Sequence, residues 1–181
     1  MDFMTFLLFL IIIIGLISIV YIIVYNNLQV YTLKINEAEG IIDDLLRKKY
    51  DLILLMKDVI FEETDLNKKT FDEVIKLKKL NLSSFDFERK LTEFNNLIIK
   101  INGDYDVLLS NIRFNNYLND LNEINQKLEA AKSFYNKYTN LLNKYTKKFP
   151  SNLIAVFHHI NTRNFFDGKD MFDDDIKDFK L

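Results

Sequence analysis

The chain has 181 residues, of which 49% are hydrophobic, and its 24 Lys and Arg nearly balance its 26 Asp and Glu. This length is enough for one modest domain, and the near-zero net charge argues against a nucleic-acid-binding surface, which needs a net basic face. The sequence contains no cysteine, which excludes disulfides, thiolate metal sites and a lipoprotein anchor.

The first predicted element is an apolar segment, residues 3–25, that carries no charged side chain. A helix of this length extends roughly 34 Å, which is enough to cross a hydrocarbon core of about 30 Å. A secretory signal peptide is the alternative, but this segment is too long, lacks a basic region before it and has no small-residue cleavage site after it. We predict a transmembrane helix over residues 3–25, preceded by a short N-terminus at residues 1–2.

Apolar residues three and four apart follow the span and predict that its helix continues into the next domain. They are Leu28, Tyr31, Ile35, Ala38, Ile42, Leu45, Leu52, Met56 and Val59. Lys49 is the one polar interruption of this series. Either its ammonium group reaches past the apolar face to water, or it meets a buried acid from a neighbouring helix.

A second helical region is predicted between Thr70 and Gly103. Thr70 and Glu73 have the spacing of a capping box, which predicts a helix start at Thr70. That helix ends near Leu80, and an apolar stripe resumes at Phe87 and continues to the Gly103 break.

The longest helical pattern begins at Phe114 and is closed by Pro150, because a residue before proline is disfavoured in the α conformation. Its apolar residues recur three and four apart, as in a seam that packs one helix along another. They are Phe114, Tyr117, Leu121, Ile124, Leu128, Ala131, Tyr135, Tyr138, Leu142, Tyr145 and Phe149. We interpret the seam tyrosines as core packing with hydroxyls at the edge, rather than as a ladder that stacks a ligand.

These patterns predict an all-α chain, since period-two alternation is nowhere sustained. The N-terminal transmembrane helix continues into an elongated antiparallel bundle of about three long helices, and a short helix follows Pro150. The bundle domain takes residues 26–167. Residues 168–181 form an acidic tail that we expect to be flexible.

Candidate catalytic and metal-binding groups are sparse. His158 and His159 are adjacent, and neighbouring helical residues point about 100° apart, so they cannot jointly hold a metal ion without a third ligand. The acid pairs, such as Asp43 with Asp44, have neither a cleft nor a defined separation. The segment 167–170 lacks the alternating ligands of a calcium loop. We predict a non-enzyme with no cofactor, no metal site and no small-molecule substrate.

Several motifs, taken in order, resemble the LemA family of bacterial membrane proteins. The matching residues are Tyr25, Asn26 and Leu28 after the span, the basic motif Arg47, Lys48, Lys49, Tyr50, Asp51 and Leu52, and distally Tyr135, Asn136, Tyr145, Phe149, Pro150 and Phe166. The resemblance spans nearly the whole chain and is weak over residues 64–104. Glu39 stands where the family commonly has a tryptophan. These motif residues are the candidates for an interaction contact, especially the stretch from Arg47 to Asp51.

The resemblance implies a single-pass protein of the bacterial cell membrane, with its N-terminus outside and an LemA-like helical domain in the cytoplasm. The positive-inside rule agrees, because Asp2 precedes the span and Lys34 follows it. Our hypothesis is a non-catalytic scaffold or adaptor that is held in the bilayer by residues 3–25 and presents its bundle to another membrane or envelope protein. The alternatives are a self-assembling structural or membrane-shaping homo-oligomer, and an enzyme built on the two histidines.

Overall fold

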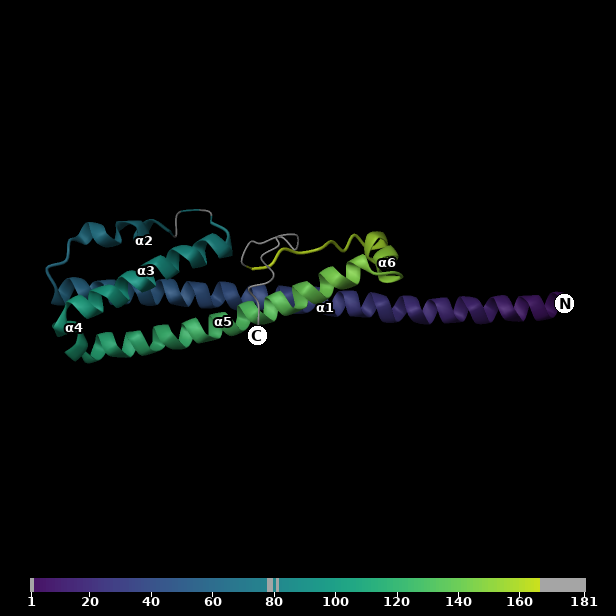
Figure 1. The fold of residues 1–181 in the computed structure, drawn as a ribbon, viewed down its shortest axis with the longest axis horizontal. Helices are drawn as coiled ribbons and strands as arrows, with labels where there is room; N and C mark the ends of the chain where they lie inside the picture. Colours follow the sequence, from purple (N-terminus) through teal and green to yellow (C-terminus); the bar gives the residue numbers. More distant parts are fainter. Residues whose placement is uncertain (1, 78–79, 81, 167–181) are drawn as a thin grey trace. The chain divides into compact units, whose positions relative to one another are not determined.

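A computed structural model describes residues 2–77, 80 and 82–166. Within these ranges it contains helices and no strand, so the predicted all-α class is confirmed (Figure 1). The described residues form two compact units. Unit 1 consists of residues 2–37 and 135–165, and unit 2 of residues 38–134 and 166, without the gaps in the description. The predicted tail at 168–181 lies outside the described residues, and the domain boundary at residue 26 stays a prediction.

Helix α1 is continuous from Phe3 to Glu63, a run of 61 residues without proline, as the spacing of apolar residues predicts. Residues 3–23 are exposed, and a window of 18 residues in this helix has a mean hydropathy of 3.3. Within the apolar segment the Ser18 hydroxyl donates to the Ile14 carbonyl at 2.8 Å, so this hydroxyl is satisfied by the backbone of its own helix. By length and composition this is one helix able to cross a membrane.

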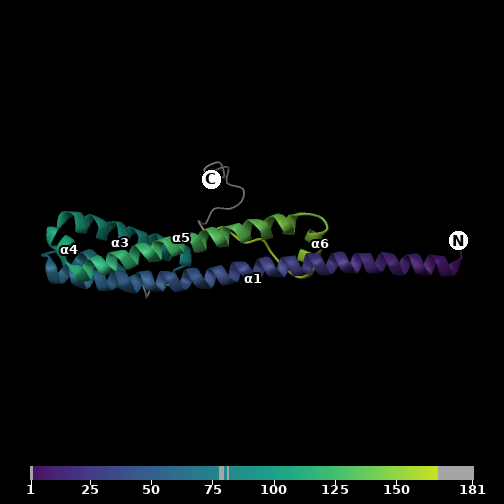
Figure 2. The ribbon, with the colours of Figure 1, turned by 90° about the horizontal axis from the view of Figure 1, so that it is seen from below.

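Unit 2 contains the second half of α1, the short elements η1 and α2, and three further helices. Their bounds are Lys68–Phe71 for η1, Asp72–Leu77 for α2, Ser84–Asp104 for α3, Asp106–Ser110 for α4 and Ile112–Lys147 for α5, which continues into unit 1. Both views show α3 and the first part of α5 beside the second half of α1 (Figures 1 and 2). The fully buried side chains include Ile42, Leu46, Ile53, Met56, Ile60, Phe71, Leu91, Ile98, Leu108 and Phe114. Burying each of these side chains stabilises the fold by roughly 1.5–3 kcal/mol. The predicted apolar faces lie in this core, and α1 buries a wider face than predicted, because Leu46, Ile53 and Ile60 are buried as well.

The helical structure after α1 begins at Lys68, earlier than the capping box predicts. Asn67 is the cap, and its side chain accepts a hydrogen bond from the Lys69 amide at 3.0 Å. Thr70 lies inside the 3₁₀ turn η1, so the prediction of a helix start at Thr70 was wrong. Asparagine is at least as good a cap as threonine, and a 3₁₀ turn often precedes an α-helix.

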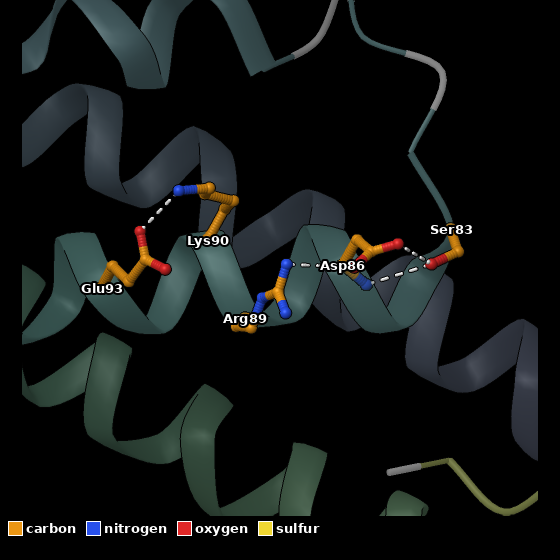
Figure 3. A network of polar contacts seen from close by, with 5 residues as sticks. All are labelled: Ser83, Asp86, Arg89, Lys90 and Glu93. Carbon is orange, nitrogen blue, oxygen red and sulfur yellow. Dashed lines mark hydrogen bonds and ion pairs between the residues drawn. The ribbon is translucent and has the colours of Figure 1, made fainter. Parts of the chain in front are cut away.

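The start of α3 is fixed by a polar chain on its exposed face (Figure 3). The Ser83 hydroxyl accepts from the Asp86 amide at 3.1 Å and donates to the Asp86 carboxylate at 2.7 Å. Arg89 pairs with Asp86 at 3.3 Å, and Lys90 pairs with Glu93 at 2.8 Å. Exposed pairs of this kind contribute about 0–1 kcal/mol each, so we assign this chain to helix capping rather than to a site.

Unit 1 contains the first half of α1, the last turns of α5, and α6, which covers Ser151–Phe157. Its buried core is small, and most of the side chains that pack against it are tyrosines. The core residues are Val24, Leu28, Ile35, Leu142, Ile154 and Ala155, and the partly buried ones are Tyr25, Tyr31, Tyr135, Tyr138, Tyr145 and Ile160. The interpretation of the seam tyrosines as packing residues is confirmed in this unit.

The predicted apolar seam extends one seam residue too far towards the C-terminus. Helix α5 ends at Lys147, and the following Phe149 is 80% exposed, although it was predicted as the last seam residue. The chain leaves the helix before this residue, and the Phe149–Pro150 peptide bond is cis. The last seam side chain that packs is therefore Tyr145.

Candidate functional site

The basic motif on α1 divides between two faces of the helix within unit 2. Successive helical residues point about 100° apart, so a run of six must meet both the core and the solvent. The motif leaves three side chains exposed, Arg47, Lys48 and Asp51, as the spacing predicts. It buries the other three, Lys49, Tyr50 and Leu52.

Lys49 lies inside unit 2 with only 2% of its surface exposed. Its Nζ donates to the Thr92 hydroxyl at 3.4 Å, and that hydroxyl donates to Glu88 Oε1 at 3.2 Å. Lys132, from α5, approaches the same Glu88 oxygen at 3.4 Å and Glu129 at 2.5 Å. Of the two predicted alternatives, the structure therefore has the buried one, in which acids from neighbouring helices balance the lysine through a shared network.

The two lysines of this network differ in protonation behaviour. Burial lowers the pKa of Lys49 because it disfavours the charged form, and the opposing charge of Glu88 does not fully offset it. Burial acts in the same direction on Lys132, but its hydrogen bond to Glu129 and the charge of Glu88 prevail and raise its pKa. A lysine with a lowered pKa is a candidate nucleophile or base, but the Lys49 amine is closed off from solvent, so we assign it a structural role.

An open hollow of about 490 Å³ lies beside the exposed part of the motif. Its apolar lining consists of Leu46, Tyr50, Leu77, Leu80, Leu82 and Phe87, and its polar lining of Asp43, Arg47, Asp51 and Ser84. The Tyr50 and Phe87 rings pack with centroids 5.8 Å apart, and the Ser84 hydroxyl donates to Asp43 at 2.6 Å. Burial, and then the charge of Asp51, raises the pKa of Tyr50, so its hydroxyl remains protonated. A hollow with an apolar lining and the charges of Arg47 and Asp51 beside it is better suited to binding a protein side chain than to catalysis.

Neither the motif residues directly after the span nor the distal ones line this hollow. Tyr25 and Tyr145 pack on the core of unit 1, where Asn27 donates to the Tyr145 hydroxyl at 3.2 Å. The Tyr135 hydroxyl donates to the Asn164 carbonyl at 3.2 Å. Asn26 is exposed, and Asn136 and Pro150 are half-buried. Most of these motif residues therefore hold unit 1 together.

Phe166, the last of the predicted motif residues, belongs to unit 2. Its ring meets Phe85 edge-on with centroids 6.3 Å apart and lies 5.9 Å from the Lys132 ammonium. A cation over an aromatic face is favourable, and here the cation is one that also pairs with Glu88. Phe166 therefore covers the lysine network rather than forming a separate contact.

Two polar residues of unit 1 were missed by the sequence reasoning. Asn143, which is 2% exposed, donates to the Arg163 carbonyl at 2.7 Å and accepts from the Arg163 amide at 2.8 Å. The Ser151 hydroxyl lies 2.6 Å from the Tyr145 carbonyl and 2.8 Å from the Lys148 carbonyl. Both fasten the turns after α5 to that helix. Neither carries a sequence signal, because asparagine and serine are common in exposed helical positions as well.

His158 and His159 end α6 and do not share a ligand site. The His158 Nε2 lies 2.6 Å from the Tyr21 hydroxyl, and its ring packs on Tyr25 at a centroid distance of 4.5 Å. His159 has φ 53°, and the Ile160 amide donates to the Ala155 carbonyl at 2.9 Å, which is the pattern of a Schellman motif. In the part of the chain that the structure describes, no group of three His, Asp or Glu side chains is arranged to hold a metal ion.

Comparison with known proteins gives one result. A family model described as the LemA family matches residues 38–177, while the chain matches no curated protein and no solved structure. The matched range contains the basic motif and all distal motif residues. It leaves out the apolar segment and the pair Tyr25 and Asn26.

Proposed function

We propose, from the premise that the chain belongs to the LemA family, that it is a non-catalytic scaffold or adaptor anchored in a bacterial cell membrane. The observation that carries this proposal is the continuity of α1. One unbroken helix bears both the exposed apolar segment of residues 3–23 and the buried face of the bundle. An element of this kind fixes a folded domain to a bilayer without a flexible linker.

The partner contact in this proposal is the hollow beside the basic motif. Two of its apolar lining residues, Leu80 and Leu82, are exposed, and the opposite charges of Arg47 and Asp51 line the same hollow. A partner that inserts an apolar or aromatic side chain and presents complementary charges at its rim would match this surface. A membrane or envelope protein is the partner class, because the anchor confines the domain to the bilayer.

Site-specific photo-crosslinking in native membranes tests the contact. A photo-reactive amino acid at Asp51 should give a discrete adduct, and the substitution Arg47→Glu should weaken it. The matched control is the same amino acid at Lys100, which is also exposed in unit 2 but does not line the hollow. Equal labelling at both positions, or no adduct in several growth conditions, would contradict the adaptor role. An adduct with a second copy of the chain would support the self-assembling alternative instead.

The orientation that we propose is N-terminus outside and bundle in the cytoplasm. It is supported by Asp2 before the apolar segment and Lys34 after it. Protease treatment of intact and opened cells that carry a C-terminal tag tests it. The tag should be cut only after the cells are opened, and cutting in intact cells would reverse the assignment.

A further inference from the structure

Helix α6 buries one face and leaves a large apolar face uncovered. Ile154 and Ala155 belong to the core of unit 1, whereas Phe149, Leu153, Val156 and Phe157 are 80%, 62%, 75% and 75% exposed. We call these four exposed residues the tip patch. Their spacing places them on one side of the short helix and the turn before it. Four adjacent side chains of this size are more apolar surface than scattered exposure explains.

The tip patch is attached to α1 where the apolar segment ends. The Tyr21 hydroxyl lies 2.6 Å from His158 Nε2, and the Tyr25 ring packs on the same imidazole. Tyr21 follows Phe3 by about 27 Å along the helix, close to the thickness of a hydrocarbon core of about 30 Å. Tyrosines are enriched at this level, where the ring meets lipid and the hydroxyl meets headgroups. Phe157, next to His158 in the chain, is thereby held beside the end of the apolar segment.

The charge of the same region is one-sided. Residues 130–166 contain no Asp or Glu, but they contain five lysines and one arginine. Lys147 and Lys148 are exposed and directly precede Phe149. By contrast, residues 38–129 contain 18 acids and 14 cations. Exposed apolar side chains beside lysines are the composition of elements that lie in the interface of an anionic membrane.

We propose that the tip patch inserts into the interface of the leaflet that α1 enters, and that Lys147 and Lys148 contact anionic phospholipid headgroups there. This inference rests on the proposed membrane anchoring. Lipid is favoured over a second copy of the chain because the tip patch lies beside the end of the apolar segment, a surface that the bilayer already covers in the anchored protein. The protein then contacts the membrane at two places, through the transmembrane part of α1 and through α6.

The absence of tryptophan from the sequence allows a direct test. Phe157→Trp gives the protein a single tryptophan, which lies in the tip patch. The matched control is Leu33→Trp, which is 56% exposed on α1 and lies about 18 Å beyond Tyr21 along the helix. A third variant, Ile12→Trp, reports the apolar segment itself. Each is reconstituted in bilayers with phosphatidylglycerol in which the phospholipid is brominated near the headgroup for F157W and L33W, and near the ends of the acyl chains for I12W, which lies about 14 Å from Tyr21 along the helix. The position of the bromine matters because bromine quenches tryptophan on contact.

We expect the F157W emission to fall by about half or more with brominated lipid, as for a side chain within roughly 5–10 Å of the acyl boundary. The L33W emission should change little, and I12W should be quenched. If F157W behaves as L33W does while I12W is quenched, the tip patch is outside the bilayer and this inference is overturned, although the anchor stands. If I12W is not quenched, the membrane anchor fails and the inference fails with it. An F157W signal that ignores brominated lipid but follows the protein-to-lipid ratio would assign the tip patch to a second copy.

A comparison of anionic and neutral bilayers tests the contact of the two lysines with phospholipid headgroups. In the F157W protein, quenching should be stronger in bilayers that contain phosphatidylglycerol than in neutral phosphatidylcholine, and added salt should reduce the difference. The variant that also carries K147Q and K148Q should lose most of this difference and keep its helical circular dichroism. Equal quenching of the parent F157W protein in both lipids would overturn the role of the lysines.

Discussion

The two units of this chain are stabilised in different ways. Among the described residues of unit 2 the interior consists mainly of aliphatic and phenylalanine side chains, together with Tyr50 and the polar network around Lys49. Unit 1 has a small apolar core, several tyrosines around it, and side chains such as Asn143 that bond directly to the backbone. Burial dominates the first and directed hydrogen bonds hold the second, so the same helices α1 and α5 obey two sets of constraints along their length. Substitutions of polar residues should therefore act globally in unit 2 and locally in unit 1.

The largest effect is expected from Glu88→Gln. It removes the charge that faces both Lys49 and Lys132, and a buried cation without its counter-ion is strongly unfavourable. We expect unfolding of the full chain in detergent, followed by circular dichroism in urea, to lose about 2 kcal/mol. The control Glu123→Gln, at an exposed pair with Lys127, should lose less than about 0.5 kcal/mol. Equal losses for both variants would show that the network around Lys49 contributes no more to the free energy of unfolding than an exposed ion pair does.

Asn143→Ala should loosen unit 1 locally. It removes two hydrogen bonds to the Arg163 backbone, at a cost of about 1 kcal/mol, because Arg163 is exposed and water can reach the freed groups. Trypsin cleaves after arginine, so the bond after Arg163 should be cut faster in the variant. Asn122→Ala, exposed on the same helix, is the control. A cleavage rate equal to that of the control would mean that the turn is held by other contacts.

Lys49→Met should leave unit 2 folded, and it should be neutral or stabilising by about 1 kcal/mol at pH 7, since Glu88 keeps its pair with Lys132. The folded-state pKa of Lys49 is lowered, so the unfolded chain binds more protons in the window below the usual lysine value of 10.5. The stability of the parent protein must therefore rise relative to the variant as pH rises through that window. The free energy of unfolding of both proteins, measured from pH 7 to 10.5, gives the difference. If the stability of the parent protein instead fell relative to the variant as pH rises, the charged form of Lys49 would be favoured in the fold.

The smallest effect is expected from His159→Gly. This residue has φ 53°, where a side chain is disfavoured and glycine is not. We expect a gain of about 0.5 kcal/mol in the stability of unit 1, partly offset by the greater freedom of glycine in the unfolded chain. Slower trypsin cleavage after Arg163 reports it. The neighbouring substitution His158→Gly should act in the opposite direction, because it removes the contact with Tyr21.

The sequence predicted the parts of the fold that depend on local periodicity. Helices α1, α3 and α5, and the exposure of Arg47, Lys48 and Asp51, follow from three-four spacing alone. The Asn67 cap was missed because Thr70 and Glu73 offered a competing cap of similar strength. The hollow beside the basic motif was missed because its lining also comes from Leu77 and Phe87, whose approach to α1 is a tertiary contact that no spacing encodes.

The same limit applies to the polar interior. Periodicity marked Lys49 as an interruption of the apolar face but could not select between an exposed and a buried ammonium, since that depends on Thr92 and Glu88 from α3. Asn143 stands one position after Leu142 and looks like any solvent-facing residue. Its role appears only when the chain after α6 returns to it.

The unbroken course of α1 limits which changes in length the protein can accept. Val24 packs with Leu28 and Ile35 in one cluster, and the helix is continuous between them. One residue inserted after Tyr25 would turn the preceding residues by about 100° and move Val24 off that face. Seven inserted residues would restore the face to within about 20° and lengthen the helix by roughly 10 Å. Related chains that differ in length here should therefore differ by steps close to whole helical repeats, whereas a chain with a loop at this place would tolerate any number.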